Sequence, residues 1–289
     1  MKILKKSFVS RARLYQGALF ATIILVGFVV PSEAQLYTLS DNDSSVQVNL
    51  NSGVSDWQID GVNQLNQQWF YYRVGSSGPE SAIQSIAAPS LISDGSANSP
   101  STLSATYANG TISVATGYSF QAAGNGSAQL TETITVKNVS GSSQAFHFFE
   151  YANFDLGGVS GNQNVQFNTL QHNLVTQSGN GITFNETAIA AGVTYEVQAG
   201  LNDGNLFGLT DGNPTALDNT LSAGPGDVNY AFEWDKTLNN NGSFIISKIM
   251  TVTVPEPSSL ALIASGMVAA ALMFRRRGSK KLDLQPELR

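Results

Sequence analysis

Apolar and polar residues alternate with a period of two in several segments of this chain. The pattern is clearest at 46–50 (VQVNL), 130–136 (LTETITV) and 245–254 (IISKIMTVTV). Successive side chains of a strand point to opposite faces, so this alternation predicts strands with one buried face. It constrains the fold more than any other feature, because residues 35–254 show no sustained helical period.

Turn-forming dipeptides separate the alternating segments. Asn-Gly and Asp-Gly pairs recur between them, and these residues accept the positive φ of tight hairpin turns. We expect 104–120 and 170–189 to be hairpins, the first closed by a type I′ turn at Asn109-Gly110. The stretch 204–212 has room for a single helical turn. Many short antiparallel strands predict an all-β fold, an antiparallel β-sandwich.

The predicted sandwich, residues 35–253, contains no cysteine and is strongly acidic. The absence of cysteine excludes disulfides and thiolate chemistry. The chain has a net charge of −6, but this region opposes 17 acidic residues with only four basic ones, Arg73, Lys137, Lys236 and Lys248. Such a domain repels phosphate backbones, so we expect no nucleic-acid partner.

The N-terminal end predicts a signal peptide over residues 1–34. Lysines and arginines precede the apolar run 17–30, and the small residues Ser32 and Ala34 follow it. We therefore expect the secretion translocon to export the chain and signal peptidase to cut between Ala34 and Gln35.

The C-terminal end combines a rigid step, an apolar run and a basic cluster. These parts are, in order, Val254-Pro255-Glu256-Pro257, residues 258–274 and Arg275-Arg276-Arg277. As a helix the apolar run would reach about 26 Å, which is sufficient to span a bilayer. The arginines would stay in the cytoplasm and fix the orientation. We expect a single transmembrane helix, followed by a cytoplasmic tail over 279–289.

The same order resembles the PEP-CTERM sorting signal of exported proteins of Gram-negative bacteria. The resemblance covers residues 254–278 and implies that a membrane-embedded exosortase recognises Pro255-Glu256-Pro257 and removes the helix. It also implies transient anchoring in the inner membrane, then delivery to the cell surface or extracellular matrix. Members of this family accompany exopolysaccharide, which makes exosortase and exopolysaccharide the expected partners.

The leading functional hypothesis is a non-enzymatic surface or matrix protein. No nucleophile elbow, phosphate-binding loop or dinucleotide motif occurs, so neither catalysis nor a cofactor is expected. His147 and His172 are the only histidines, which excludes a multi-histidine metal site. We interpret His147, which lies between aromatic residues, as a packed strand residue and expect no metal.

Two alternatives remain open. The first is a secreted, glycoside hydrolase-like enzyme, since Glu233 and Asp235 would share one strand face beside aromatic residues. Its candidate carboxylates are Glu150, Asp155, Glu233 and Asp235. The second is a carbohydrate-binding module that stacks sugar rings on aromatics of 57–75, although a buried core is the simpler explanation of those aromatics.

Overall fold

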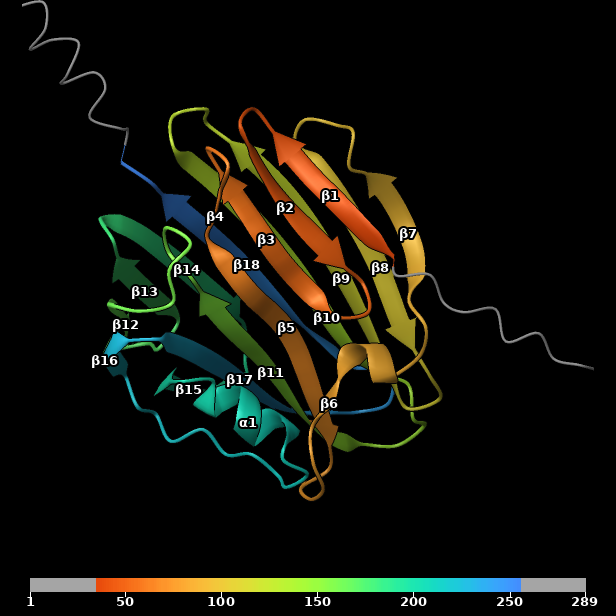
Figure 1. Ribbon diagram of the computed structural model, residues 1–289. Helices are drawn as coiled ribbons and strands as arrows, with labels where there is room; N and C mark the ends of the chain where they lie inside the picture. Colours follow the sequence, from red (N-terminus) through yellow and green to blue (C-terminus); the bar gives the residue numbers. More distant parts are fainter. Residues whose placement is uncertain (1–34, 256–289) are drawn as a thin grey trace, which may run out of the picture. The chain divides into compact units, whose positions relative to one another are not determined.

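A computed structural model describes residues 35–255, which form two sheets of nine strands each (Figure 1). All paired strands are antiparallel, so the predicted all-β sandwich is confirmed. The first sheet consists of β1 (Leu36–Asp41), β2 (Ser44–Asn49), β3 (Gly53–Ile59), β4 (Val62–Asn63), β5 (Leu65–Val74), β6 (Ser81–Ala82), β11 (Gln144–Phe154), β15 (Thr194–Leu201) and β17 (Val228–Leu238). The second consists of β7 (Ser90–Gly95), β8 (Ser101–Ala108), β9 (Ile112–Ala122), β10 (Ser127–Asn138), β12 (Gln163–Phe167), β13 (Leu174–Gly179), β14 (Ile182–Ala190), β16 (Ser222–Gly226) and β18 (Ser243–Thr253).

Strand order brings together segments that are far apart in the sequence. The first sheet runs β1-β2-β3-β5-β11-β17-β15, with β4 beside β3 and β6 beside β5. The second runs β16-β12-β13-β14-β18-β10-β9-β8-β7. The last strand, β18, is therefore a central strand, flanked by β14 and β10.

The core lies between the sheets and is rich in aromatic side chains. Trp57 of the first sheet meets Phe120 of the second edge to face, with ring centroids 5.8 Å apart. Phe154 of the first sheet also contacts Phe184 of the second, but these two rings are stacked. Each such side chain contributes about 1.5–3 kcal/mol when it is fully buried. The aromatics of 57–75 largely belong to this buried set, as the simpler interpretation predicted.

The two predicted hairpins form, but they turn differently. Asn180-Gly181 joins β13 to β14 with φ values of 53° and 79°, as a type I′ turn requires. Asn109-Gly110 joins β8 to β9 without a positive φ at either residue, so the type I′ prediction was wrong there. The Asn109 side chain instead accepts hydrogen bonds from the amides of Thr111 and Ile112, and this Asx turn replaces the positive-φ geometry.

The single predicted helical turn is confirmed as α1 (Gly204–Thr210), and a short 3₁₀ turn, η1 (Ile83–Ser85), follows β6. Within residues 35–255, no helix is long and apolar enough to cross a membrane. The predicted signal peptide, which includes Ala34, and everything from Glu256 onward lie outside the described residues. These include Pro257, the apolar run, Arg275, Arg276, Arg277 and the tail.

Candidate functional site

Strand register places a basic residue, a histidine and a carboxylate in one row on the outer face of the first sheet. His147 of β11 lies opposite Arg73 of β5 on one side and Asp235 of β17 on the other. The next row of the same face contains Phe149 and Glu233, which are also direct partners. Glu233 and Asp235 therefore share a face, as their spacing predicted.

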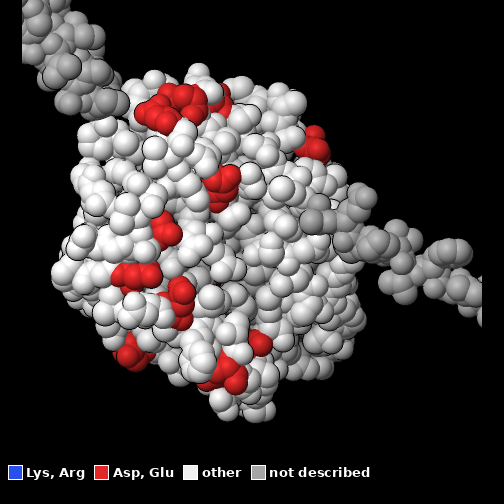
Figure 2. Space-filling view, viewed as in Figure 1, with Lys and Arg blue, Asp and Glu red and all other residues white. Residues whose placement is uncertain are grey.

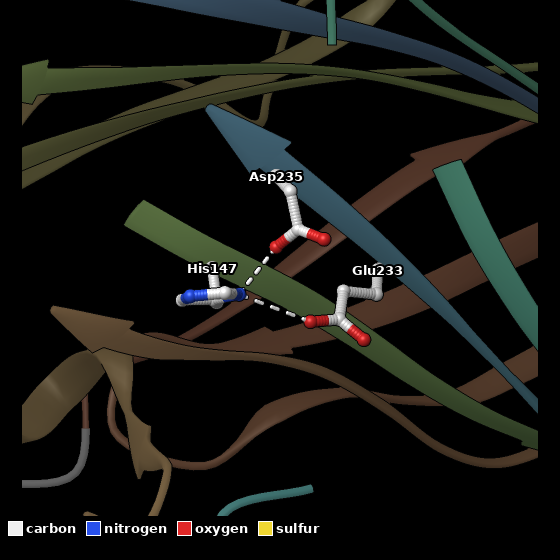
Figure 3. Close-up of side chains that lie close together, drawn as sticks. All are labelled: His147, Glu233 and Asp235. Carbon is white, nitrogen blue, oxygen red and sulfur yellow. Dashed lines mark hydrogen bonds and ion pairs between the residues drawn. The ribbon is translucent and has the colours of Figure 1, made fainter. Parts of the chain in front are cut away.

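The side chains of His147, Glu233 and Asp235 converge, and we call them the outer cluster (Figure 3). His147 Nδ1 lies 3.2 Å from Glu233 Oε1 and also contacts Asp235 Oδ1. The other ring nitrogen of His147 points away from both carboxylates in Figure 3. The side chains of His147 and Asp235 are 21% and 28% exposed, whereas that of Glu233 is only 3% exposed. Solvent therefore reaches the cluster from the side of His147 and Asp235.

Arg73 closes the buried side of the outer cluster. Its guanidinium contacts Glu80, lies 4.0 Å from Glu233 Oε1 and donates to the backbone oxygen of Thr215. Thr215 in turn donates its amide and its hydroxyl to the Glu80 carboxylate. The segment after α1 is thus fastened over Arg73, and this explains why Glu233 is shielded while His147 is not.

The hydrogen bonds of the outer cluster hold a proton on His147. The bond to Asp235, and then the bond to Glu233, raise the pKa of His147 from 6.5 to about 9. Burial raises the pKa of Glu233, an effect that the hydrogen bond from His147 opposes. At neutral pH His147 is therefore an imidazolium held between two carboxylates, with its second N–H available to an external acceptor.

The outer cluster also has the donors of a metal site. One ligand atom from each of its three residues lies within 4.8 Å of the other two. Imidazole and carboxylate together suit zinc, manganese or iron, but His147 would have to lose its Nδ1 proton to bind one. The positive charge of Arg73 beside Glu233 works against a bound cation. Sequence analysis missed this grouping, because only the register of β11 and β17 brings His147 to Glu233 and Asp235.

Glu150 and Asp155, the other two candidate carboxylates, do not join the outer cluster. Glu150 is opposite Phe232, so it points between the sheets and is fully buried. Asp155 follows β11, and burial, together with the charges of Asp227 and Asp203, raises its pKa. The four candidate carboxylates thus fall into three separate environments.

The aromatic residues offer little surface for sugar stacking. The three tryptophans, Trp57, Trp69 and Trp234, are buried. Among residues 35–255, the only large aromatic residue with a mostly exposed side chain is Phe207 of α1, which is 71% exposed. The basis on which we considered a carbohydrate-binding module therefore lies inside the protein.

The face seen in Figure 2 carries scattered acidic side chains on a largely uncharged surface. No basic side chain of the described residues is visible on it. This agrees with the excess of acidic residues in the sequence. Such a surface favours solubility and repels polyanions.

Comparison with solved structures finds a likeness of fold to part of a larger protein and weaker matches to others. A bacterial glucoamylase in complex with acarbose matches with a TM-score of 0.50 and 10% identity, over 80% of this chain and 35% of that one. The chain thus spans about a third of the glucoamylase, and the likeness shows the fold alone. The GalM/aldose epimerase homologue from C. elegans matches at a TM-score of 0.45 and 6% identity, over 77% of this chain and 100% of that one.

Comparison with the curated proteins finds no match. The PEP-CTERM protein-sorting motif, in contrast, matches residues 253–277. This agrees with the order of Pro-Glu-Pro step, apolar run and arginines noted in the sequence. The chain therefore carries a PEP-CTERM protein-sorting motif, which implies export, a membrane-anchored sorting signal and processing by an exosortase.

Proposed function

We propose that this protein is a non-enzymatic component of the cell surface or extracellular matrix, associated with exopolysaccharide. The observation that carries the proposal is the position of the sorting motif relative to the fold. The motif begins at Thr253, which is the last residue of β18. Removal of the segment that follows would leave all the described strands on the released product.

The contacts at the end of β18 support this boundary between the fold and the sorting motif. The amide of Val254 donates to the backbone oxygen of Gly126 at 2.7 Å, which extends the β18 ladder by one residue. Pro255 has no amide hydrogen and cannot continue a ladder. The chain beyond it would remain available as an extended substrate for the exosortase, while β18 stays fixed between β14 and β10.

The chemistry of the outer cluster also supports a non-enzymatic role. A general acid works best when its pKa lies near the operating pH. His147, with a pKa near 9, releases its proton poorly at neutral pH. The cluster is better suited to holding a hydrogen-bond acceptor than to transferring a proton.

The sorting proposal is tested by two variants in a host that carries an exosortase. Replacing Pro255-Glu256-Pro257 with three alanines should block processing but leave the domain exported and anchored. Deleting residues 258–289 should release it into the periplasm. Fractionation and mass spectrometry of the surface form measure both outcomes. A surface form that retains Arg275 to Arg277, or normal processing of the triple-alanine variant, would contradict the sorting proposal. The C-terminal segment would then be a permanent anchor.

A second candidate is a carbohydrate-active enzyme, favoured by one feature of the outer cluster. Ligand oxygens of Glu233 and Asp235 lie within 4.8 Å of each other. This is closer to the roughly 5 Å separation of retaining glycosidases than to the roughly 6.5–9.5 Å of inverting ones. Turnover of a chromogenic glycoside that is lost in Glu233→Gln would select this candidate. Saturable polysaccharide binding without turnover would select the non-enzymatic one.

A further inference from the structure

Four charged side chains meet between the two sheets, and none of them reaches solvent. We call Lys248, Glu132, Glu150 and Glu186 the inner cluster. Lys248 of β18 lies opposite Glu132 of β10, and Glu186 comes from β14 on the other side of β18. Glu150 belongs to β11 of the other sheet. The side chain of each residue is at most 1% exposed.

Lys248 is in direct contact with carboxylates from both layers. Its Nζ lies 2.7 Å from Glu132 Oε2 and 3.4 Å from Glu186 Oε1, and it contacts Glu150 Oε1 across the sandwich. Gln68 also donates its side-chain amide to Glu150 Oε1, at 3.1 Å. The ring centroid of Phe70 lies 5.1 Å from Nζ. Amine and carboxyl are thus held together in a site without access to water.

The charges of the inner cluster do not balance as free ions. Three carboxylates surround one ammonium, and burial raises the pKa of both Glu132 and Glu150, which makes each a better proton acceptor than an exposed carboxylate. Oxygens Glu132 Oε1 and Glu150 Oε2 are buried without a hydrogen-bond partner. Each ion removed from water costs several kcal/mol. A reaction that removes one positive and one negative charge from this site would remove that cost for those two ions.

We propose that Lys248 and Glu150 condense to form an isopeptide bond that joins β18 to β11 across the two sheets. The Lys248 ammonium first gives a proton to the Glu150 carboxylate, which leaves a neutral amine and a carboxylic acid. The amine lone pair then forms the C–N bond at Glu150 Cδ. Glu132 takes the second amine proton and delivers it to the departing hydroxyl, so the C–O bond breaks and one water molecule leaves. No oxidant or co-reactant is needed.

The surroundings provide what this condensation requires. Fixed contact between the reacting groups replaces a bimolecular encounter, an advantage that reaches effective molarities of about 10⁵ M or more. Glu132 touches Nζ and so can relay the proton. The Gln68 amide polarises the Glu150 carboxyl through its hydrogen bond. Exclusion of water from the core disfavours the reverse hydrolysis.

The bond would fix the strand that precedes the sorting motif. β18 ends at Thr253, where the motif begins, so any force on the membrane-proximal end acts first on this strand. The chain has no cysteine and therefore no disulfide to resist that force. An amide between β18 and β11 would cross-link the two layers without any redox chemistry.

The test is the mass of the full chain, expressed with its own signal peptide and purified in a folded form. After peptide mapping has identified its termini, the denatured protein should be lighter than its sequence by one water molecule. Trypsin should then fail to cut after Lys248. The peptide that contains Lys248 should remain joined to 138–236, and fragment ions should locate the link at Glu150.

Two variants separate the bond from a simple ion pair. Lys248→Arg keeps the charge but cannot form this amide, so the mass deficit should disappear. Lys236→Arg alters a lysine outside the inner cluster and should keep the deficit. The wild-type mass decides the matter even where Lys248→Arg fails to fold. Full sequence mass in folded wild-type protein, a link at Glu132 or Glu186, or loss of ammonia through Gln68 would each overturn the proposal.

Discussion

Strand β11 separates two groups of charged side chains that differ in their access to water. Glu150 points inward and belongs to the inner cluster, where the side chains are at most 1% exposed. His147, three residues earlier, points outward and belongs to the outer cluster, with a side chain that is 21% exposed. Both clusters combine carboxylates with one nitrogen base, so composition alone does not distinguish them.

The difference lies in how each cluster neutralises its charge. The inner cluster cannot exchange ions or protons with solvent, and it must balance three carboxylates internally by proton retention, ion pairing or condensation. The outer cluster shares its proton with solvent through His147. Any external ligand of these two groups must therefore bind at the outer cluster, while the inner cluster acts only on the fold.

The largest expected effect is the loss of Lys248. Lys248→Met would remove the proposed amide with Glu150 and, in unreacted protein, the positive partner of the buried carboxylates, and breaking a buried pair typically costs about 3–5 kcal/mol. Urea denaturation of the purified protein should show this decrease in the free energy of unfolding. Lys236→Met, which alters a lysine at an exposed backbone contact, should stay within about 0.5 kcal/mol.

A smaller loss of stability in Lys248→Met would contradict the difference drawn between the two clusters. If Lys248→Met costs less than about 1 kcal/mol, the inner carboxylates are fully protonated in the fold and the lysine is not needed to balance them. A stability loss as large for Lys236→Met would likewise show that the position of Lys248 between the sheets has no special importance.

The outer cluster should produce an intermediate effect, seen in the pH dependence of stability. The pKa of His147 is 6.5 in the unfolded chain and about 9 in the fold. Because the folded value is raised, the stabilisation is fully present below pH 6.5 and is lost as the pH rises through about 9. Denaturation midpoints should fall across this window, and His147→Gln should flatten the fall. His172→Asn, at the other histidine, is the control and should leave the fall unchanged.

Much of the fold was predictable because the alternation of residues reports local geometry directly. In β10, Leu130 and Ile134 point inward, and period two places Glu132 on the same face. In β18, Ile246 and Met250 do the same for Lys248. The alternation therefore predicts that these two charged side chains point inward. It does not predict that β10 pairs with β18, because that pairing depends on strand order.

The outer cluster was only half predictable for the same reason. Glu233 and Asp235 lie two apart on one strand, so their shared face followed from the sequence. Whether Glu150 joins these two carboxylates depends on the register between β11 and β17. That register places Phe149, and not Glu150, opposite Glu233. The same register brings His147 to Asp235. Contacts within a strand could be predicted, whereas contacts between strands distant in sequence could not.

The smallest expected effect is a change in the pKa of His147 itself, and it tests which carboxylate holds the proton. Asp235 is the more exposed partner, but its hydrogen bond raises the pKa of His147 more than that of Glu233. The contact of His147 Nδ1 with Asp235 Oδ1 is closer than its 3.2 Å bond to Glu233 Oε1, and Glu233 Oε1 also lies 4.0 Å from the Arg73 guanidinium. Asp235→Asn should therefore lower the pKa of His147 toward 6.5 by more than Glu233→Gln does.

NMR titration of the His147 ring measures both changes, with the ring of His172 as an internal reference. A larger drop in Glu233→Gln would mean that burial strengthens the Glu233 bond more than Arg73 weakens it. The outer cluster would then resemble the inner one, where the buried carboxylates dominate. If neither variant changes the pKa of His147, then His147 is not hydrogen-bonded to these carboxylates in solution. The outer cluster would then not hold a proton in the way described.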